Sequence, residues 1–100
     1  MKTTIETTEG KALVTLEGVL DSYIAEEIAE QFEPLFELSD SEITLDCTNL
    51  EYIASSGLRL FLMLLQNTKP NGCSVIIKGA CEELMSVFES TGFKPLFKFI

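Results

Sequence analysis

The chain has 100 residues, 46% hydrophobic and 23% charged, a composition typical of a folded globular protein rather than a disordered segment. Its net charge of −9 disfavours binding to nucleic acid or to an anionic membrane, because both are themselves negative. The absence of histidine excludes Ser-His-Asp and Cys-His nucleophile pairs and any histidine-containing zinc site. We therefore expect a single domain over 1–100 that is not an enzyme and uses no cofactor or metal.

The cysteines and the apolar runs indicate the compartment. Cys47, Cys73 and Cys81 form no C-x-x-C pair, and we expect them to be free thiols that behave as small buried hydrophobes. No apolar N-terminal run resembles a signal peptide, and the longest apolar run, 60–65, is too short to span a bilayer. These features favour a cytoplasmic protein with no membrane insertion.

The acidic residues are unevenly distributed. No basic residue lies between Lys11 and Arg59, whereas eleven carboxylates do. Such a field favours basic protein surfaces as partners, although a solvated helix face accounts for the same pattern. The eleven are Glu17, Asp21, Glu26, Glu27, Glu30, Glu33, Glu37, Asp40, Glu42, Asp46 and Glu51.

The first half of the chain predicts a hairpin followed by a helix. Residues 2–7 and the alternating run 12–17 indicate two antiparallel strands, the second ending at Gly18. Asp21 or Ser22 can cap a helix, and Pro34 should break it. Apolar residues at spacings of three and four define the inward face of that helix: Ile24, Ile28, Phe32, Leu35 and Phe36.

The second half predicts alternating strands and helices. We expect a strand at 43–47, a loop at 48–55, a helix at 56–67 that is apolar nearly all round, and a strand at 74–78. A helix at 82–90 should stop at Gly92, and 96–99 should form a last strand. The order favours an α/β fold: a mixed sheet with an N-terminal hairpin, then βα units with right-handed crossovers. Its functional end should lie at the carboxyl ends of the strands.

Three motifs carry a resemblance to a known family. The stretch 49–59, Asn-Leu-Glu-Tyr-Ile-Ala-Ser-Ser-Gly-Leu-Arg, resembles the phosphorylation loop of the anti-sigma factor antagonists, which are STAS-domain proteins. Gly-Val-Leu-Asp at 18–21 is similar to an upstream element of that family. The segment 84–93, with its Thr-Gly stop, is similar to its final helix. Each motif alone is weak, but their order and spacing match along the whole chain.

The resemblance implies a bacterial protein–protein switch in signal transduction and transcription regulation. A member of this family binds a serine kinase that is also an anti-sigma factor, and thereby frees the sigma factor. The kinase phosphorylates the first serine of the loop, here Ser55, which ends binding, and a serine phosphatase resets the switch. The implied partner-binding residues are Asp21, Tyr52, Ala54, Ser55, Ser56, Gly57 and Arg59.

The residues of the loop allow this chemistry. Ser55 is expected at or next to a helix N-cap, where a phosphate can accept from free backbone N–H groups and gain from the helix dipole. Arg59 lies one turn on and can pair with that phosphate, with a partner's carboxylate, or with solvent alone. Ser56 is the second candidate for phosphorylation, although helix capping or close packing is its simpler role. Ala54 stands where the family commonly has Asp, so a carboxylate is missing beside the switch.

Two other functions remain open at this stage. Similar domains serve without phosphorylation as scaffold subunits of signalling assemblies and of lipid-transport complexes. An α/β enzyme using Asp21, Asp46 and a Ser55 nucleophile is disfavoured, since no histidine or nearby lysine activates the serine. The sequence leaves open the sigma factor, nucleotide binding and the oligomeric state.

Overall fold

The structure is a computed structural model that describes residues 1–100. Five strands form one sheet in the order β1-β2-β3-β4-β5, with β1 and β2 antiparallel and all later neighbours parallel. The elements are β1 (Lys2–Thr8), β2 (Lys11–Leu20), α1 (Ser22–Phe32), β3 (Glu42–Ile53), α2 (Ser55–Thr68), β4 (Ser74–Lys78), α3 (Glu82–Ser90) and β5 (Lys98–Phe99), with 3-10 turns η1 (Glu33–Glu37), η2 (Lys69–Asn71) and η3 (Lys94–Leu96).

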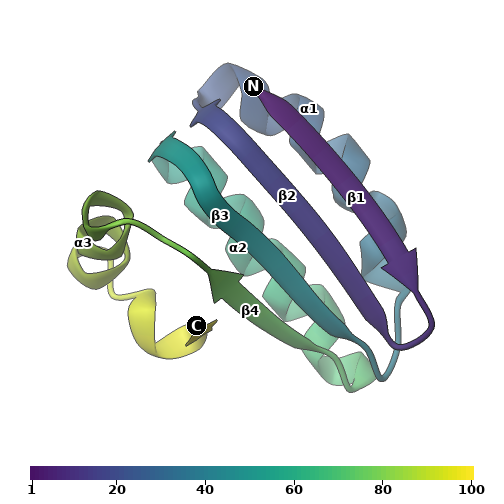
Figure 1. Ribbon diagram of the computed structural model, residues 1–100. Coiled ribbons are helices and arrows are strands. Elements are labelled where there is room, and N and C mark those ends of the chain that lie inside the picture. Colours follow the sequence, from purple (N-terminus) through teal and green to yellow (C-terminus); the bar gives the residue numbers. More distant parts are fainter.

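The predicted fold class is confirmed. The N-terminal hairpin leads into β2-α1-β3 and β3-α2-β4 units, and Figure 1 shows α1 and α2 together behind the sheet. In that view β2, β3 and β4 point to the upper left. The crossovers through α1 and α2 pass behind the sheet and the next strand lies to the left, which is the right-handed sense. The helices therefore leave the opposite face of the sheet open.

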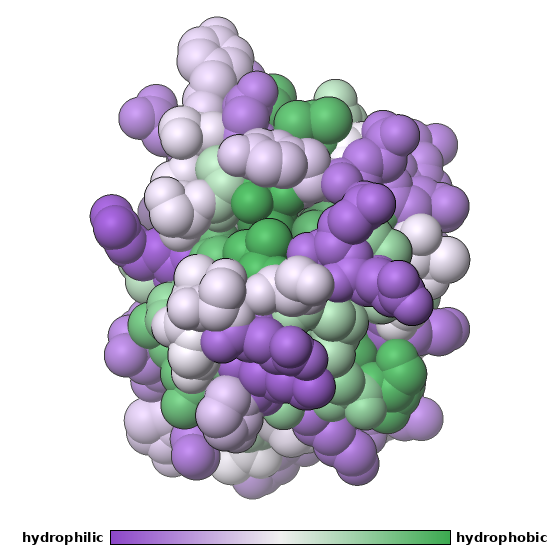
Figure 2. All heavy atoms as spheres, turned by 90° about the vertical axis from the view of Figure 1, so that its left-hand side faces the viewer, coloured by the Kyte–Doolittle hydropathy of each residue, from purple (hydrophilic) through white to green (hydrophobic).

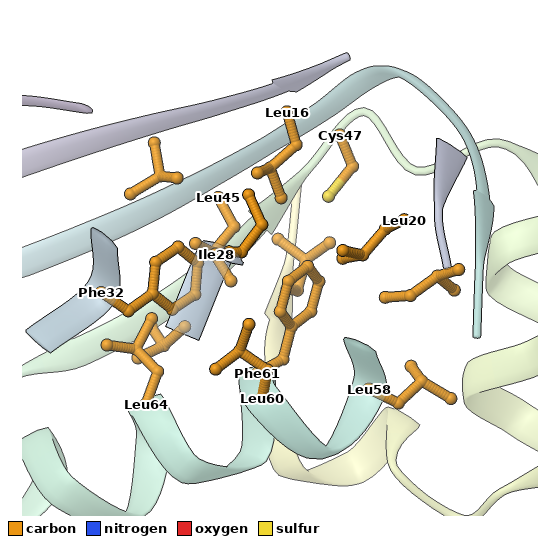
Figure 3. Packing of buried hydrophobic residues seen from close by; sticks show 14 of the residues in the cluster. Leu16, Leu20, Ile28, Phe32, Leu45, Cys47, Leu58, Leu60, Phe61 and Leu64 are labelled. Carbon is orange, nitrogen blue, oxygen red and sulfur yellow. The ribbon is translucent and has the colours of Figure 1, made fainter. Parts of the chain in front are cut away.

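The core lies between the sheet and its helices. Figure 3 shows side chains from β2, β3, α1 and α2 that meet there, among them Leu16, Leu45, Phe32 and Phe61. Phe61 is fully buried, while Leu62 and Leu65 are half-buried on the flanks of α2. The prediction that this apolar helix packs on the sheet is confirmed, because Leu58, Phe61 and Leu64 are buried in one cluster with the strand residues.

The boundaries of α1 follow from local chemistry, as expected. The Asp21 carboxylate caps the helix by accepting a hydrogen bond from the Ile24 amide at 2.9 Å. Pro34 lacks an amide hydrogen, and α1 ends at Phe32, where the chain tightens into η1. The predicted face is inward: Ile28, Phe32 and Leu35 are buried, and Ile24 and Phe36 are partly buried.

Two predicted strand ends are wrong, for one reason. β2 does not end at Gly18 but continues to Leu20, and 48–53 is the second half of β3 rather than a loop. The pairing of β2 with β3 shifts register twice, because β3 carries an extra residue on each occasion. These bulges space the buried residues Cys47, Leu50 and Ile53 three apart instead of two, which hides the strand from a search for alternation.

The C-terminal part agrees with expectation except in its last strand. β4 and α3 have the predicted bounds, and Gly92 takes a left-handed φ of 78° after the last turn of α3. Leu96 lies in η3 rather than in a strand, so β5 is only Lys98–Phe99. Pro95 favours the start of η3, in which the Leu96 and Phe97 amides donate to Phe93 and Lys94 instead of to β4, so β5 begins late. None of the helices combines the length and apolarity that crossing a membrane requires.

The cysteines are free thiols in two different environments. Cys47 and Cys73 are buried, as predicted, whereas Cys81 is exposed and contradicts the expectation of three buried thiols. Burial is the main cause that raises the pKa of the Cys47 thiol to about 12, which keeps it protonated near neutral pH.

Brief treatment of the folded protein with iodoacetamide should therefore modify Cys81 alone. Thiolates are the reactive form, and the reagent needs access to the sulfur. Intact-mass spectrometry should show one added carbamidomethyl group, and peptide mapping should place it on Cys81. Unfolding in urea should raise the number to three. Early labelling of Cys47 in the folded protein would contradict the burial described here.

Candidate functional site

The ends of β2 and β3 bring the two predicted segments together. Leu20 pairs with Ile53 in the parallel ladder, and the Ala54 amide donates to the Leu20 carbonyl at 2.8 Å. Asp21 and Ser55 follow these residues directly, so both lie at the carboxyl edge of the sheet. The expectation that these two segments share one edge is confirmed.

Ser55 is the first residue of α2, and Ala54 occupies the N-cap position. Ser55 is therefore next to the N-cap, which is one of the two positions expected from the sequence. The side chain of Ala54 makes no capping hydrogen bond, and the amides of Ser55 and Ser56 donate to no group of the protein. The exposed Ser55 hydroxyl thus stands beside two free N–H donors at the positive end of a helix dipole.

Ser56 does not cap the helix either. Its hydroxyl oxygen is buried and has no hydrogen-bond partner, so of its two expected roles only close packing applies. Ser56 lines a shallow groove of about 300 Å³ between α1 and α2 together with Ser22, Ala25, Glu26, Ala29, Arg59, Leu60 and Met63. Because its hydroxyl is buried while that of Ser55 is exposed, Ser55 is the more accessible of the two serines.

Gly57 is explained by close approach rather than by an unusual φ. A Cβ atom at this position would lie 2.9 Å from side-chain atoms of both Leu20 and Ile53. Both of these residues are almost fully buried. The glycine therefore lets the first turn of α2 sit directly on the ends of β2 and β3, which places Ser55 at the same edge of the sheet as Asp21.

Four exposed side chains lie on the segments around Ser55 and Asp21. Arg59 lies on α2 four residues after Ser55, on the same side of the helix, and makes no ion pair. Tyr52 is 53% exposed and pairs in register with Val19, which is 42% exposed. Tyr23, on the first turn of α1, is 75% exposed. Sequence reasoning missed Val19 and Tyr23, because nothing in their local pattern distinguishes exposed apolar residues from core ones.

The carboxylate of Asp46 is engaged by Thr48 on the same strand. The Thr48 hydroxyl and amide both donate to one of its carboxylate oxygens, at 2.6 and 3.0 Å. The Thr48 hydroxyl is the main cause that lowers the pKa of Asp46. This bond stabilises the folded state above the pKa of the unfolded carboxyl and is lost as the pH falls through the lower folded value. No structural feature joins Asp46 to Ser55 in a catalytic arrangement, and no three metal-ligating residues lie close enough to hold an ion.

Comparison with known proteins identifies the class. A family model described as "Mlab, STAS domain" matches residues 3–98, and the chain belongs to the STAS-domain family. It is 32% identical over 98 residues to the anti-sigma-B factor antagonist of Staphylococcus aureus, covering 96% of this chain and 91% of that protein. It is 30% identical over 83 residues to the protein of the same name from Staphylococcus epidermidis, covering 83% and 77% of the two chains.

Solved structures share the fold. The anti-sigma factor antagonist SpoIIAA in its unphosphorylated form superposes with a TM-score of 0.78 at 18% identity, covering 99% of this chain and 87% of SpoIIAA. The phosphorylated form of Bacillus SpoIIAA gives a TM-score of 0.77 at 20% identity, covering 99% and 91%. At these identities the likeness establishes the fold alone.

Proposed function

We propose that this protein is an anti-sigma factor antagonist that binds an anti-sigma factor serine kinase and is switched off by phosphorylation of Ser55. One observation carries the proposal: Ser55 is exposed at the start of α2 beside two unpaired amides, and a hydrogen bond from the Ala54 amide to the Leu20 carbonyl holds that turn at the end of β2, where Asp21 follows. The names of the staphylococcal relatives support the antagonist role, and they are regulatory rather than enzymatic names.

A phosphate on Ser55 suits this position physically. The free amides of Ser55 and Ser56 supply donors, and the N-terminus of a 14-residue helix favours negative charge. The modification therefore leaves α2 intact while adding about two negative charges to the surface. Arg59, one turn on, is the nearest cation along the helix. If it pairs with a partner's carboxylate in the unmodified protein, the phosphate competes for Arg59 and repels that carboxylate.

An anti-sigma factor serine kinase that binds this protein should phosphorylate Ser55 and then release the protein. With ATP, intact-mass spectrometry should show one added phosphate on the unmodified chain and on Ser56→Ala, and none on Ser55→Ala. The Ser55→Ala variant should stay bound to the kinase, because it keeps the surface but lacks the acceptor. Ser55→Glu should bind the kinase about tenfold more weakly than the unmodified protein, because it adds a negative charge to the binding surface. The loss should be smaller than that caused by phosphate, since one carboxylate carries less charge and fewer acceptors.

Ser56→Ala is the matched control, because it removes the neighbouring hydroxyl and keeps the proposed acceptor. Phosphorylation of Ser55→Ala but not of Ser56→Ala would move the site by one residue. No phosphate on either the unmodified protein or Ser56→Ala would reject the switch.

Charge reversal at Asp21 and Arg59 should weaken kinase binding by about tenfold for each variant, provided that each side chain meets an opposite charge. The affinity of each variant for the kinase is measured by isothermal titration calorimetry. Glu6→Lys on β1 is the control for a change of net charge alone. Asp21→Lys also removes the cap of α1, so its unfolding must be measured in parallel. Unchanged affinity in folded variants would place the binding surface elsewhere.

The second candidate is a STAS scaffold without phosphorylation control. Two observations favour it: the matching family model carries the Mlab description, and Ala54 stands where the antagonists commonly have Asp. A scaffold should form a complex that persists in ATP and is unaffected by Ser55→Glu. The experiment with the kinase therefore separates the two candidates.

A further inference from the structure

The second half of β3 has a free edge. β4 pairs with β3 only over Glu42–Asp46, and β4 ends at Lys78. Gly79 then passes against Thr48, after which the chain turns away into α3. No main-chain hydrogen bond links residues 49–53 to a strand other than β2. Figure 1 shows the tip of β3 extending beyond β4, and α3 contacts β3 without adding a strand to this edge.

A hollow lies beside this edge. It has a volume of about 500 Å³ and lies between β3 and the first turn of α3, lined by Thr48, Asn49, Leu50, Glu51, Cys81 and Glu83. Figure 2 views the side that carries α3 and the C-terminal segment, and shows apolar surface sunk between polar side chains. Five residues of extended chain span about 16 Å, enough for a short strand to pair along residues 49–53.

The charge around the hollow selects its occupant. Two of the lining side chains, Glu51 and Glu83, are carboxylates, and none is a cation. Free strand edges invite unwanted pairing, and natural proteins blunt them with bulges and charges. Here the bulges limit the length of any added strand, whereas Glu51 disfavours an acidic strand or a second copy of this acidic chain and does not disfavour a basic one.

We propose that the free edge of β3 is a strand-addition site for an extended, cationic segment of a partner protein. Main-chain hydrogen bonds along residues 49–53 supply the affinity, and the carboxylates of Glu51 and Glu83 select lysine or arginine side chains. Alternate apolar side chains of the segment enter the hollow over Leu50 and Cys81. This site goes beyond the proposed switch and does not need Ser55 to be modified, so failure of either leaves the other standing.

The probe is a heptapeptide of alternating lysine and valine, titrated into the ¹⁵N-labelled protein and followed by NMR and hydrogen exchange. Shifts and added protection should be confined to residues 48–53 and the first turn of α3. The same peptide, N-methylated on the amides that would face β3, should not bind, because those amides can no longer donate to the ladder. Its charge is unchanged, so it separates strand pairing from charge attraction. A control peptide with glutamate in place of each lysine should not bind.

Glu83→Lys should weaken the lysine peptide by about fivefold, whereas its neighbour Glu82→Lys should change affinity by less than about twofold. The two substitutions alter net charge equally at the same helix end, but only Glu83 lines the hollow. Equal binding of the N-methylated peptide, or shifts spread over the acidic face of α1, would mean non-specific attraction and overturn the proposal. Protection of 49–53 that grows with protein concentration without peptide would assign the edge to self-association instead.

Discussion

Phe88→Ala should lower the free energy of unfolding by about 3–5 kcal/mol, the usual loss for a large aromatic residue removed from a core. Phe88 is 1% exposed and is the centre of an aromatic cluster on α3. Its ring centroid lies 6.4 Å from that of Phe61, 5.9 Å from Phe97 and 5.2 Å from Phe99. The substitution therefore removes the contacts that join α3 and β5 to α2.

Urea unfolding followed by circular dichroism measures this loss directly. Domains of this size have a total stability of about 5–15 kcal/mol, so the variant should be partly unfolded at modest urea concentrations. Phe36→Ala is the matched control: the same change at a half-buried position should cost less than half as much. A loss below about 1 kcal/mol for Phe88→Ala would mean that α3 is held by other contacts.

Gly57→Ala should destabilise the protein by about 1–3 kcal/mol, the usual effect of overpacking a filled site. Alanine is the better helix former by about 1 kcal/mol, so helix propensity alone predicts the opposite sign. The added methyl group would lie 2.9 Å from atoms of Leu20 and Ile53, which are buried and have little room to move. We therefore expect α2 to lift from the strand ends and Ser55 to move with it.

Thermal unfolding gives the stability change, and NMR shifts of the Ser55 and Asp21 amides report the movement of the switch. Ser56→Ala, in the same turn, should be neutral or slightly stabilising, because it removes a buried hydroxyl that has no hydrogen-bond partner. A stabilising Gly57→Ala would show that propensity outweighs the contact with Leu20 and Ile53.

The local signals in the sequence were sufficient for most element boundaries. The Asp21 cap, the break at Pro34 and the left-handed stop at Gly92 each depend on one residue and its immediate neighbours, so each could be predicted. The spacing of apolar residues predicted the inward face of α1 in the same way. The order of strands and helices then determined the parallel mixed sheet, because few other topologies connect such a series.

The sequence predicted some features of the candidate site and not others. Ser55 and Asp21 could be singled out from motifs and placed at one sheet edge, since strands that run parallel end together. The capping state of Ser55 and Ser56 could not be predicted, because it depends on which residue begins α2, and that is set by how the turn packs on Leu20 and Ile53.

The sequence by itself determined the fold and the order of the elements, and it singled out Ser55 as the proposed switch residue. Only the tertiary structure decided that 48–53 is a bulged strand, that Val19 and Tyr52 face solvent as a pair, and that β4 stops short of the end of β3. Local patterns report how a residue relates to its neighbours in the chain. Bulges, exposed pairs and free edges are relations between two strands, and they exist only once the strands have paired.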